Sequence, residues 1–151
     1  MYIRDKRSPV PLSEAVSRVM SANRDRDTRP ELRLRKALWH AGLRGYRLHR
    51  PVRTASGSDR QIVARPDISF VGKKLAIFVH GCFWHRCPKC KYKLPKTNTE
   101  FWKQKFERNV ARDESKRIAL ESQGWTVITV WECELKTNLD STIVSIQKAL
   151  N

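Results

Sequence analysis

An unbroken apolar run extends from Leu75 to Val79 and stops at His80-Gly81. A continuous apolar run of this length is typical of a strand that is buried on both faces. The segment 61–70 reads as a strand or the approach to one, and the turn residues Gly72-Lys73 separate it from the apolar run. The pattern therefore predicts an antiparallel hairpin that ends at His80.

Helices are predicted on both sides of this hairpin. Thr28-x-x-Glu31 fits a capping box and begins a helix that stops at Gly42. Thr97-x-x-Glu100 begins a long charged helix to about Gln123, with a break near Asn109 and Gly124 as its C-cap. The other expected elements are a short helix at 13–23, a strand at 45–50, a loop at 51–60, a strand at 125–131 and a last helix capped by Asp140. This order predicts an α/β fold.

The length of 151 residues is that of one domain with its own core. We expect residues 1–12 to form a flexible basic arm and residues 13–151 to form the domain. The chain has 31 Lys+Arg against 15 Asp+Glu, a net charge of +16. Such an excess indicates a polyanionic partner, although a solvated surface or a ribosome-like role also produces one.

The setting inferred from the sequence is the cytosol. No apolar stretch approaches the length of a membrane span, and the first residues lack the apolar run of a signal peptide. In a reducing compartment, cysteines are more often metal ligands or free thiols than disulfides.

The four cysteines predict a structural zinc site. Cys87-Pro88-Lys89-Cys90 is a Cys-x-x-Cys turn, Cys82 lies five residues before it, and Cys133 follows the strand expected at 125–131. Four thiolates satisfy the tetrahedral preference of Zn²⁺ and leave no open coordination position. The alternatives are buried apolar cysteines or a redox pair formed by Cys87 and Cys90. A redox pair would explain neither of the other two cysteines.

Acidic and imidazole side chains meet at the ends of the predicted hairpin. Asp67 lies where one strand begins, and His80 and His85 lie where its partner ends. A carboxylate there is suited to hold Mg²⁺ against a phosphodiester, and a nearby histidine to take a proton from the attacking water. The alternative for Pro66-Asp67 alone is a turn before a strand.

Several motifs, taken together, resemble those of the very-short-patch-repair (Vsr) endonucleases. The motifs are HGCFWH at 80–85, FW at 101–102, NVARD at 109–113, GW at 124–125 and VWEC at 130–133. The resemblance implies a restriction-endonuclease-like fold, with a central mixed β-sheet flanked by helices and a structural zinc. It also implies an enzyme that uses Mg²⁺ to nick double-stranded DNA 5′ of the thymine in a T·G mismatch, which arises by deamination of 5-methylcytosine.

The resemblance also implies site roles. Asp67 would be the principal Mg²⁺ ligand, helped by the main-chain carbonyl of Val79, where the family has threonine. His85 would act on the attacking water. The expected accessory catalytic groups are Glu31, His80 and Asp113. The expected DNA-intercalating residues are Phe83, Trp84, Trp102 and Met20, and a core position is the alternative for each aromatic.

Three functions remain open at this point: the mismatch nickase, a restriction-type or broader nuclease, and a zinc-bearing DNA-binding module without catalysis. The nickase would be a bacterial cytoplasmic protein that joins the nucleoid when acting. It would act as a monomer on DNA, alongside a cytosine-5 DNA methyltransferase and repair proteins. The connection 51–65 is longer and more basic than the resemblance leads us to expect, and it could alter sequence preference.

Overall fold

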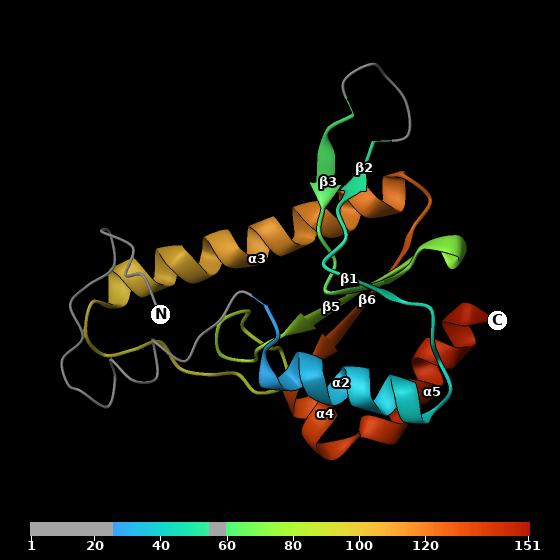
Figure 1. Cartoon of the computed structure of the whole chain (residues 1–151). Helices are drawn as coiled ribbons and strands as arrows, with labels where there is room; N and C mark the ends of the chain where they lie inside the picture. The colour runs from blue at the N-terminus through green and yellow to red at the C-terminus, as the bar shows by residue number, and fades with distance from the viewer. Residues whose placement is uncertain (1–25, 55–59) are drawn as a thin grey trace.

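The computed structural model describes residues 26–54 and 60–151, so the expected arm 1–12, the expected helix 13–23 and Met20 lie outside the described residues. Figure 1 shows the arrangement of the elements. In chain order these are α2 (Arg29–His40), β1 (Arg47–Leu48), β2 (Val52–Arg53), β3 (Ile62–Ala64), β4 (Ile68–Phe70), the 3₁₀ turn η1 (Val71–Lys73), β5 (Leu75–His80), α3 (Thr99–Ser122), β6 (Thr126–Trp131), α4 (Glu132–Thr137) and α5 (Leu139–Leu150).

The main sheet has the strand order β1-β4-β5-β6. β4 and β5 are antiparallel, with Ile68 opposite Ile77, and β5 and β6 are parallel. The sheet is therefore mixed, and the hairpin predicted from the apolar run is confirmed. β2 and β3 form a separate antiparallel pair.

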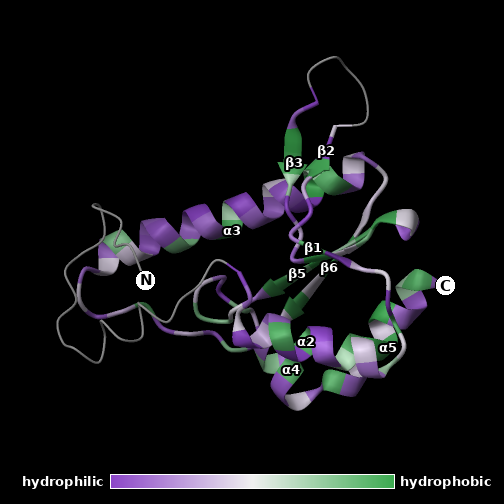
Figure 2. Cartoon of the chain, viewed as in Figure 1, coloured by the Kyte–Doolittle hydropathy of each residue, from purple (hydrophilic) through white to green (hydrophobic). Residues whose placement is uncertain are grey.

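Helices cover both faces of the main sheet, with α3 on one face and α2, α4 and α5 on the other (Figure 1). β5 is buried along its whole length, as its continuous apolar run predicts. Its side chains alternate between the two layers. Leu75, Ile77 and Val79 join the core formed with α2, α4 and α5. Ala76 and Phe78 join Leu120 of α3 in a second core cluster, and Figure 2 shows the apolar strands between the helices.

Two predicted strand boundaries are wrong. The expected loop 51–60 contains β2, and the expected strand 61–70 is divided at Pro66 into β3 and β4. Proline has no amide hydrogen to donate to a strand ladder. The buried Pro66 lies where the chain passes from the small sheet to the main sheet.

Three helix predictions are also corrected. The long helix begins at Thr99 rather than Thr97, because Asn98 has a left-handed backbone with φ of 55°. It continues through Asn109, whose side chain donates a hydrogen bond of 3.2 Å to the Trp84 carbonyl. The last helix is capped at Asn138, which places Asp140 in its first turn. The short helix α4, which contains Cys133, was not predicted.

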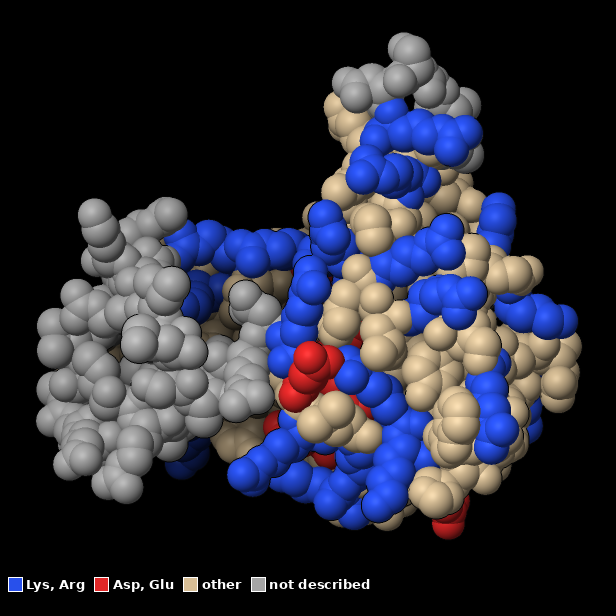
Figure 3. All heavy atoms as spheres, viewed as in Figure 1, with Lys and Arg blue, Asp and Glu red and all other residues tan. Residues whose placement is uncertain are grey.

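Basic side chains cover much of the visible surface of the described residues (Figure 3). Among the described helices, none combines the length and the apolar character that crossing a membrane requires.

Candidate active site

Asp67 lies directly before β4, at the end of the sheet where β5 finishes. Its Oδ2 accepts a hydrogen bond of 2.7 Å from the Val79 amide. Burial raises the pKa of Asp67 to about 6, and the negative charge of Glu31 adds to this effect, while the Val79 amide opposes it. His49 and His85 lower the pKa of Asp67 without cancelling the effect of burial, so a cation bound at this half-buried carboxylate would stabilise its ionised form. The contact seen uses the N–H of Val79, and its carbonyl as a metal ligand stays a prediction.

We expect Asp67→Asn to stabilise the metal-free protein at neutral pH. The pKa of about 6 in the folded protein exceeds the ordinary 3.8. The folded state therefore binds this proton more tightly than the unfolded state does, and the contribution of Asp67 to stability falls as pH rises from about 4 through 6. The shift corresponds to about 3 kcal/mol as an upper bound. Asparagine removes this charge, and its Oδ1 can still accept from Val79.

Urea unfolding at pH 4.5 and 7.5, without added divalent cation, measures this difference. The advantage of Asp67→Asn over the wild type should grow with pH. An advantage that is the same at both pH values would contradict the assigned cause.

Glu31 connects Asp67 to the N-terminus of α2. Thr28 caps this helix, since its Oγ1 accepts from the Glu31 amide at 3.4 Å. The Glu31 carboxylate, which is buried, accepts from the Asp27 amide at 3.1 Å and from Arg35 at 3.2 Å. Thr28 is therefore the N-cap as predicted, but the return hydrogen bond to the Glu31 carboxylate comes from the Asp27 amide, one residue before the cap. This bond fixes the carboxylate towards the site.

His49 is a site residue that sequence reasoning missed. Its Nε2 lies 3.3 Å from Oε2 of Glu31, and its Nδ1 lies 3.9 Å from Oδ1 of Asp67. Its amide donates to the Asp67 carbonyl at 3.2 Å, because β1 pairs with β4. The available signal was a histidine in the strand expected at 45–50, but only the pairing of β1 with β4 places it beside both carboxylates. Asp27, Glu31 and His49 offer ligand atoms within 4.8 Å of one another.

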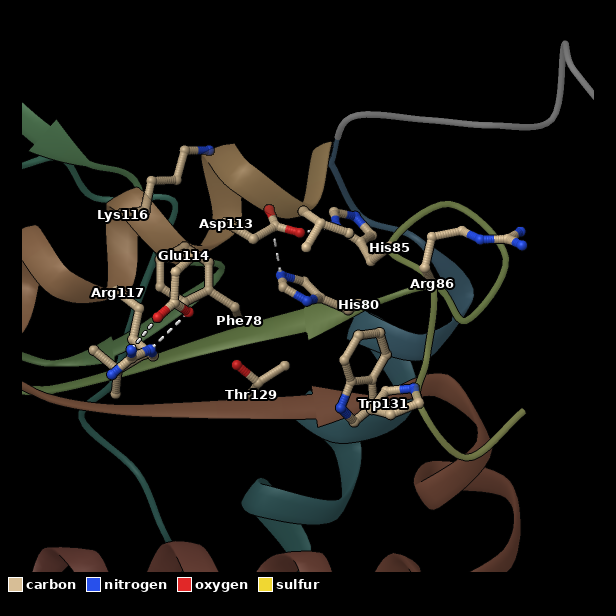
Figure 4. Close-up of a pocket in the computed structure, with 13 residues that line it drawn as sticks. Phe78, His80, His85, Arg86, Asp113, Glu114, Lys116, Arg117, Thr129 and Trp131 are labelled. Carbon is tan, nitrogen blue, oxygen red and sulfur yellow. Dashed lines mark hydrogen bonds and ion pairs between the residues drawn. The ribbon is translucent and has the colours of Figure 1, made fainter. Parts of the chain in front are cut away.

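His85, His80 and Asp113 form a second cluster on the α3 side of the sheet (Figure 4). Nδ1 of His85 lies 2.6 Å from Oδ2 of Asp113. The His80 ring stacks on the His85 ring with 4.0 Å between centroids, and its Nε2 lies 3.9 Å from Oδ1 of Asp113. α3 supplies the aspartate, and β5 with its following loop supplies the two imidazoles.

The electrostatics of this cluster separate the two histidines. Burial lowers the pKa of His80 to about 4, and charge on His85 acts in the same direction. His80 is therefore neutral near pH 7. Burial works to raise the pKa of Asp113, but its hydrogen bond with His85 and the charge of His85 outweigh this and lower it. An ionised Asp113 accepts the Nδ1 proton of His85, which assigns the lone pair to Nε2. A lone pair held in this way can accept a proton from water.

The two clusters are neighbours, because charge on His85 also acts on the pKa of Asp67. The structure therefore brings the five expected catalytic residues into one connected region. These residues are Glu31, Asp67, His80, His85 and Asp113. A hollow between α3 and the strands reaches His80 and His85 and is lined further by Trp131 and by basic side chains (Figure 4). The arrangement combines a carboxylate pair that can hold a cation with a base that can act on water.

The four cysteines meet beside this region, although two segments far apart in sequence provide them. Their sulfurs all lie within 4.8 Å of one another, and those of Cys87 and Cys133 are 3.8 Å apart. Tetrahedral coordination with Zn–S bonds of about 2.3 Å puts sulfurs about 3.8 Å apart. Backbone amides of Cys90 and Lys89 lower the pKa of Cys87 despite its burial, which favours the ligand form of the thiol. This donor set fits one metal ion.

The aromatic residues expected to intercalate form one cluster. Phe83 and Trp84 meet edge to face at 5.2 Å between centroids, and Trp84 lies 5.9 Å from Trp102. Phe106 of α3, which is buried, contacts both Phe83 and Trp102. Phe83, Trp84 and Trp102 are each half-buried, so Phe106 serves as the floor and the other three rings are partly accessible.

Residues 12–91 match the sequence family described as DNA mismatch endonuclease Vsr. The match includes Asp67, His80 and His85 and ends before α3.

Relatives extend the similarity over more of the chain. The Type II nicking enzyme V.NaeI of Lentzea aerocolonigenes is 43% identical over 126 residues, which cover 83% of this chain and 72% of the relative. The Type II nicking enzyme V.XorIIP of Xanthomonas oryzae pv. oryzae is 41% identical over 117 residues, 78% of this chain and 79% of the relative. The DNA mismatch endonuclease Vsr of Escherichia coli (strain K12) is 38% identical over 120 residues, 80% of this chain and 70% of the relative.

Proposed function

The chain belongs to the Vsr family of DNA mismatch endonucleases, and from this premise we propose that it nicks duplex DNA 5′ of the thymine of a T·G mismatch. It is a DNA-nicking hydrolase that acts in mismatch repair. What we propose beyond this family assignment is the T·G substrate, the metal and the roles of the individual residues. The observation that carries this proposal is the half-buried Asp67, which lies within electrostatic reach of Glu31 and of the His85–Asp113 pair.

In the proposed reaction Asp67 and the Val79 carbonyl would hold Mg²⁺, and Glu31, His80 and Asp113 would orient the groups around the water. A cation at Asp67 would relieve the repulsion from the negative charge of the buried Glu31, which helps to raise the pKa of Asp67. The chemistry that Mg²⁺ would supply when bound there is polarisation of the phosphodiester and stabilisation of charge on the leaving oxygen. His85 takes the proton of the water at Nε2, while Asp113 holds Nδ1–H. His49 and Arg35 hold the Glu31 carboxylate in place.

A nicking assay on duplexes that differ in one base pair tests the substrate. Labelled T·G, T·A and C·G duplexes are incubated with and without Mg²⁺, and the cut strand is identified by its label. We expect one nick, in the thymine strand of the T·G duplex, only when Mg²⁺ is present. Equal cutting of the matched duplexes would favour a broader nuclease, and binding without cutting would favour a DNA-binding module.

We expect Trp84→Ala to weaken binding of the T·G duplex by about 5- to 150-fold, since base–aromatic stacking contributes about 1–3 kcal/mol. In the proposal Phe83, Trp84 and Trp102 wedge into the duplex beside the mismatch, where unstacking costs least. Met20 has the same proposed role, although it lies outside the described residues. Fluorescence anisotropy measures the dissociation constant. Trp39→Ala is the matched control, because Trp39 is 53% exposed on α2, outside the aromatic cluster.

The unfolding temperature of the Trp84 variant should fall by no more than is expected when a half-buried side chain is truncated. A variant that is strongly destabilised yet binds normally would identify Trp84 as a core residue.

The cysteine cluster is proposed to hold one structural Zn²⁺, with Cys82, Cys87, Cys90 and Cys133 as ligands. Purified protein should contain about one zinc per chain, and Cys133→Ala should lose both the zinc and thermal stability, because metal binding is coupled to folding. Cys90→His is the matched control. Cys90 is exposed, and histidine can replace one thiolate in a tetrahedral site. Folded, active protein without zinc would exclude this site.

The proposed setting is the bacterial cytoplasm, at the nucleoid, with the protein acting as a monomer. A cytosine-5 DNA methyltransferase and repair proteins are its proposed functional associates. Analytical ultracentrifugation of the protein with one duplex tests the stoichiometry, and a complex with two protein chains would exclude the monomer.

A further inference from the structure

The hairpin formed by β2 and β3 projects from the body of the molecule, and its residues have no place in the catalytic arrangement (Figure 1). We propose that this hairpin is a second DNA-contacting surface, which binds backbone phosphates of the duplex at a distance from the nick. Arg53, Arg60 and Arg65 provide the contacts. The inference rests on the proposed function in two respects, that the ligand is duplex DNA and that the scissile phosphate lies at Asp67.

The two faces of the hairpin differ in chemistry. Val52 and Ala64 are opposite each other and buried, and they pack in the core cluster that contains Leu120 of α3. Arg53 lies opposite Ile62 on the outer face, and both are exposed. The alternation of strand side chains puts one face on the protein and leaves the other for solvent or a ligand.

Hydrogen bonds and a buried face hold the two strands of the hairpin together and position the Arg53 side chain. The Thr54 amide donates to the Gln61 carbonyl at 3.0 Å, and Nη1 of Arg53 donates to the Arg60 carbonyl at 3.0 Å. The buried face adds contacts with α3. Fixed side chains lose less conformational entropy when they bind a ligand.

The outer face has strong positive charge and little to neutralise it. Between Glu31 and Glu100 the sequence has only Asp59 and Asp67 as acidic residues. Within the described ranges, no ion pair involves Arg53, Arg60 or Arg65. Figure 3 shows basic side chains along the projecting hairpin and on the adjoining surface of the body.

The position of the hairpin favours DNA over another acidic partner. β3 leads through Arg65 and Pro66 directly to Asp67, where the proposed function places the scissile phosphate. A duplex in the active site therefore starts at the root of the hairpin. The described outer face has no aromatic ring on which a base could stack, while guanidinium groups pair well with phosphates. Phosphate contacts position a duplex without reading its sequence.

The test uses the double variant Arg53→Gln/Arg60→Gln in the full chain. Dissociation constants for a long T·G duplex are measured against salt concentration, without divalent cation to prevent cutting. Each lost phosphate contact should reduce the slope of log K against log salt by about 0.9, so we expect a reduction of about 2. Arg33→Gln/Lys36→Gln removes the same charge from exposed positions on α2 and should change the slope less.

Duplex length locates the contact. Duplexes are shortened one base pair at a time from either end. In one of the two series the wild type should lose affinity at a defined length, and below that length the double variant should bind as the wild type does. An unchanged slope on the long duplex, or a loss that is equal at all lengths or equal in the α2 control, would overturn the inference.

A matched duplex separates this inference from the proposed T·G specificity. Because the contacts are to phosphates, the change in slope should be the same on matched and mismatched DNA. If preference for T·G fails while this change persists, the hairpin surface stands and the proposed substrate falls.

Discussion

Asp67→Asn is expected to abolish nicking of the T·G duplex while leaving its binding intact or tighter. The carboxylate is the proposed principal anchor for Mg²⁺, and an amide is a much poorer ligand for this hard cation. The side chain lies in a buried site beside a second carboxylate, so removal of its charge also reduces repulsion of the phosphate. Asparagine has nearly the same shape and can keep the hydrogen bond from Val79.

Three measurements separate chemistry from binding in this variant. Single-turnover nicking reports the reaction, anisotropy reports the dissociation constant of the duplex, and calorimetry with Mg²⁺ reports the cation site itself. Asp140→Asn is the matched control, because it makes the same change at an exposed position on α5. Normal nicking by Asp67→Asn would exclude Asp67 as the metal anchor. Equal loss of DNA binding and nicking would indicate a role in binding instead.

The elements that the sequence predicted well are those whose signal is local. β5 was predicted from five consecutive apolar residues, and its burial on both faces follows from the same run. The hairpin with β4 followed because Gly72-Lys73 separates two strand-like segments. The helix 29–40 was predicted from Thr28, Pro30 and Glu31, and Thr28 is its N-cap as predicted.

The wrong boundaries have tertiary causes. Asn109 was expected to interrupt α3, but its side chain finds a partner in the Trp84 carbonyl of another segment. Pro66 divides a segment that reads as one strand, since the two halves belong to different sheets. α4 is a single short, charged segment after β6, and its composition gives no clear helical stripe.

The site was predicted where motifs place residues on neighbouring elements, but the contacts within it depend on pairing between distant strands. The sequence put Asp67 and the two histidines at the ends of one hairpin. His49 is absent from that prediction because it reaches Asp67 only through β1, which pairs with β4 some twenty residues later in the chain (Leu48 with Ile68). A motif can name the residues of such a site, whereas the orientation of each side chain comes from the fold.

His85→Ala is expected to slow single-turnover nicking by about 10²–10⁴-fold, the usual contribution of a general base. Residual activity should still require Mg²⁺. In the wild type the rate should fall in acid, since a protonated imidazole cannot accept a proton. The variant should lose that part of the pH dependence. His80 stays neutral until about pH 4, because burial lowers its pKa.

His40→Ala is the matched control, because it removes a histidine from an exposed position at the end of α2. It should nick at the wild-type rate. DNA binding by His85→Ala should also stay close to that of the wild type, which would place its effect on the chemical step.

Asp113→Asn tests whether Asp113 acts through His85. The Asp113 carboxylate lies 2.6 Å from Nδ1 of His85, so its charge and orientation reach the water only through the imidazole. Alone, Asp113→Asn should slow nicking; in a protein that already has His85→Ala, it should have little further effect, because residues that act as a unit are not additive. Full additivity would show an independent role for Asp113. A near wild-type rate for His85→Ala would make His80 the next candidate base, since its buried Nδ1 has no hydrogen-bond partner among the described residues.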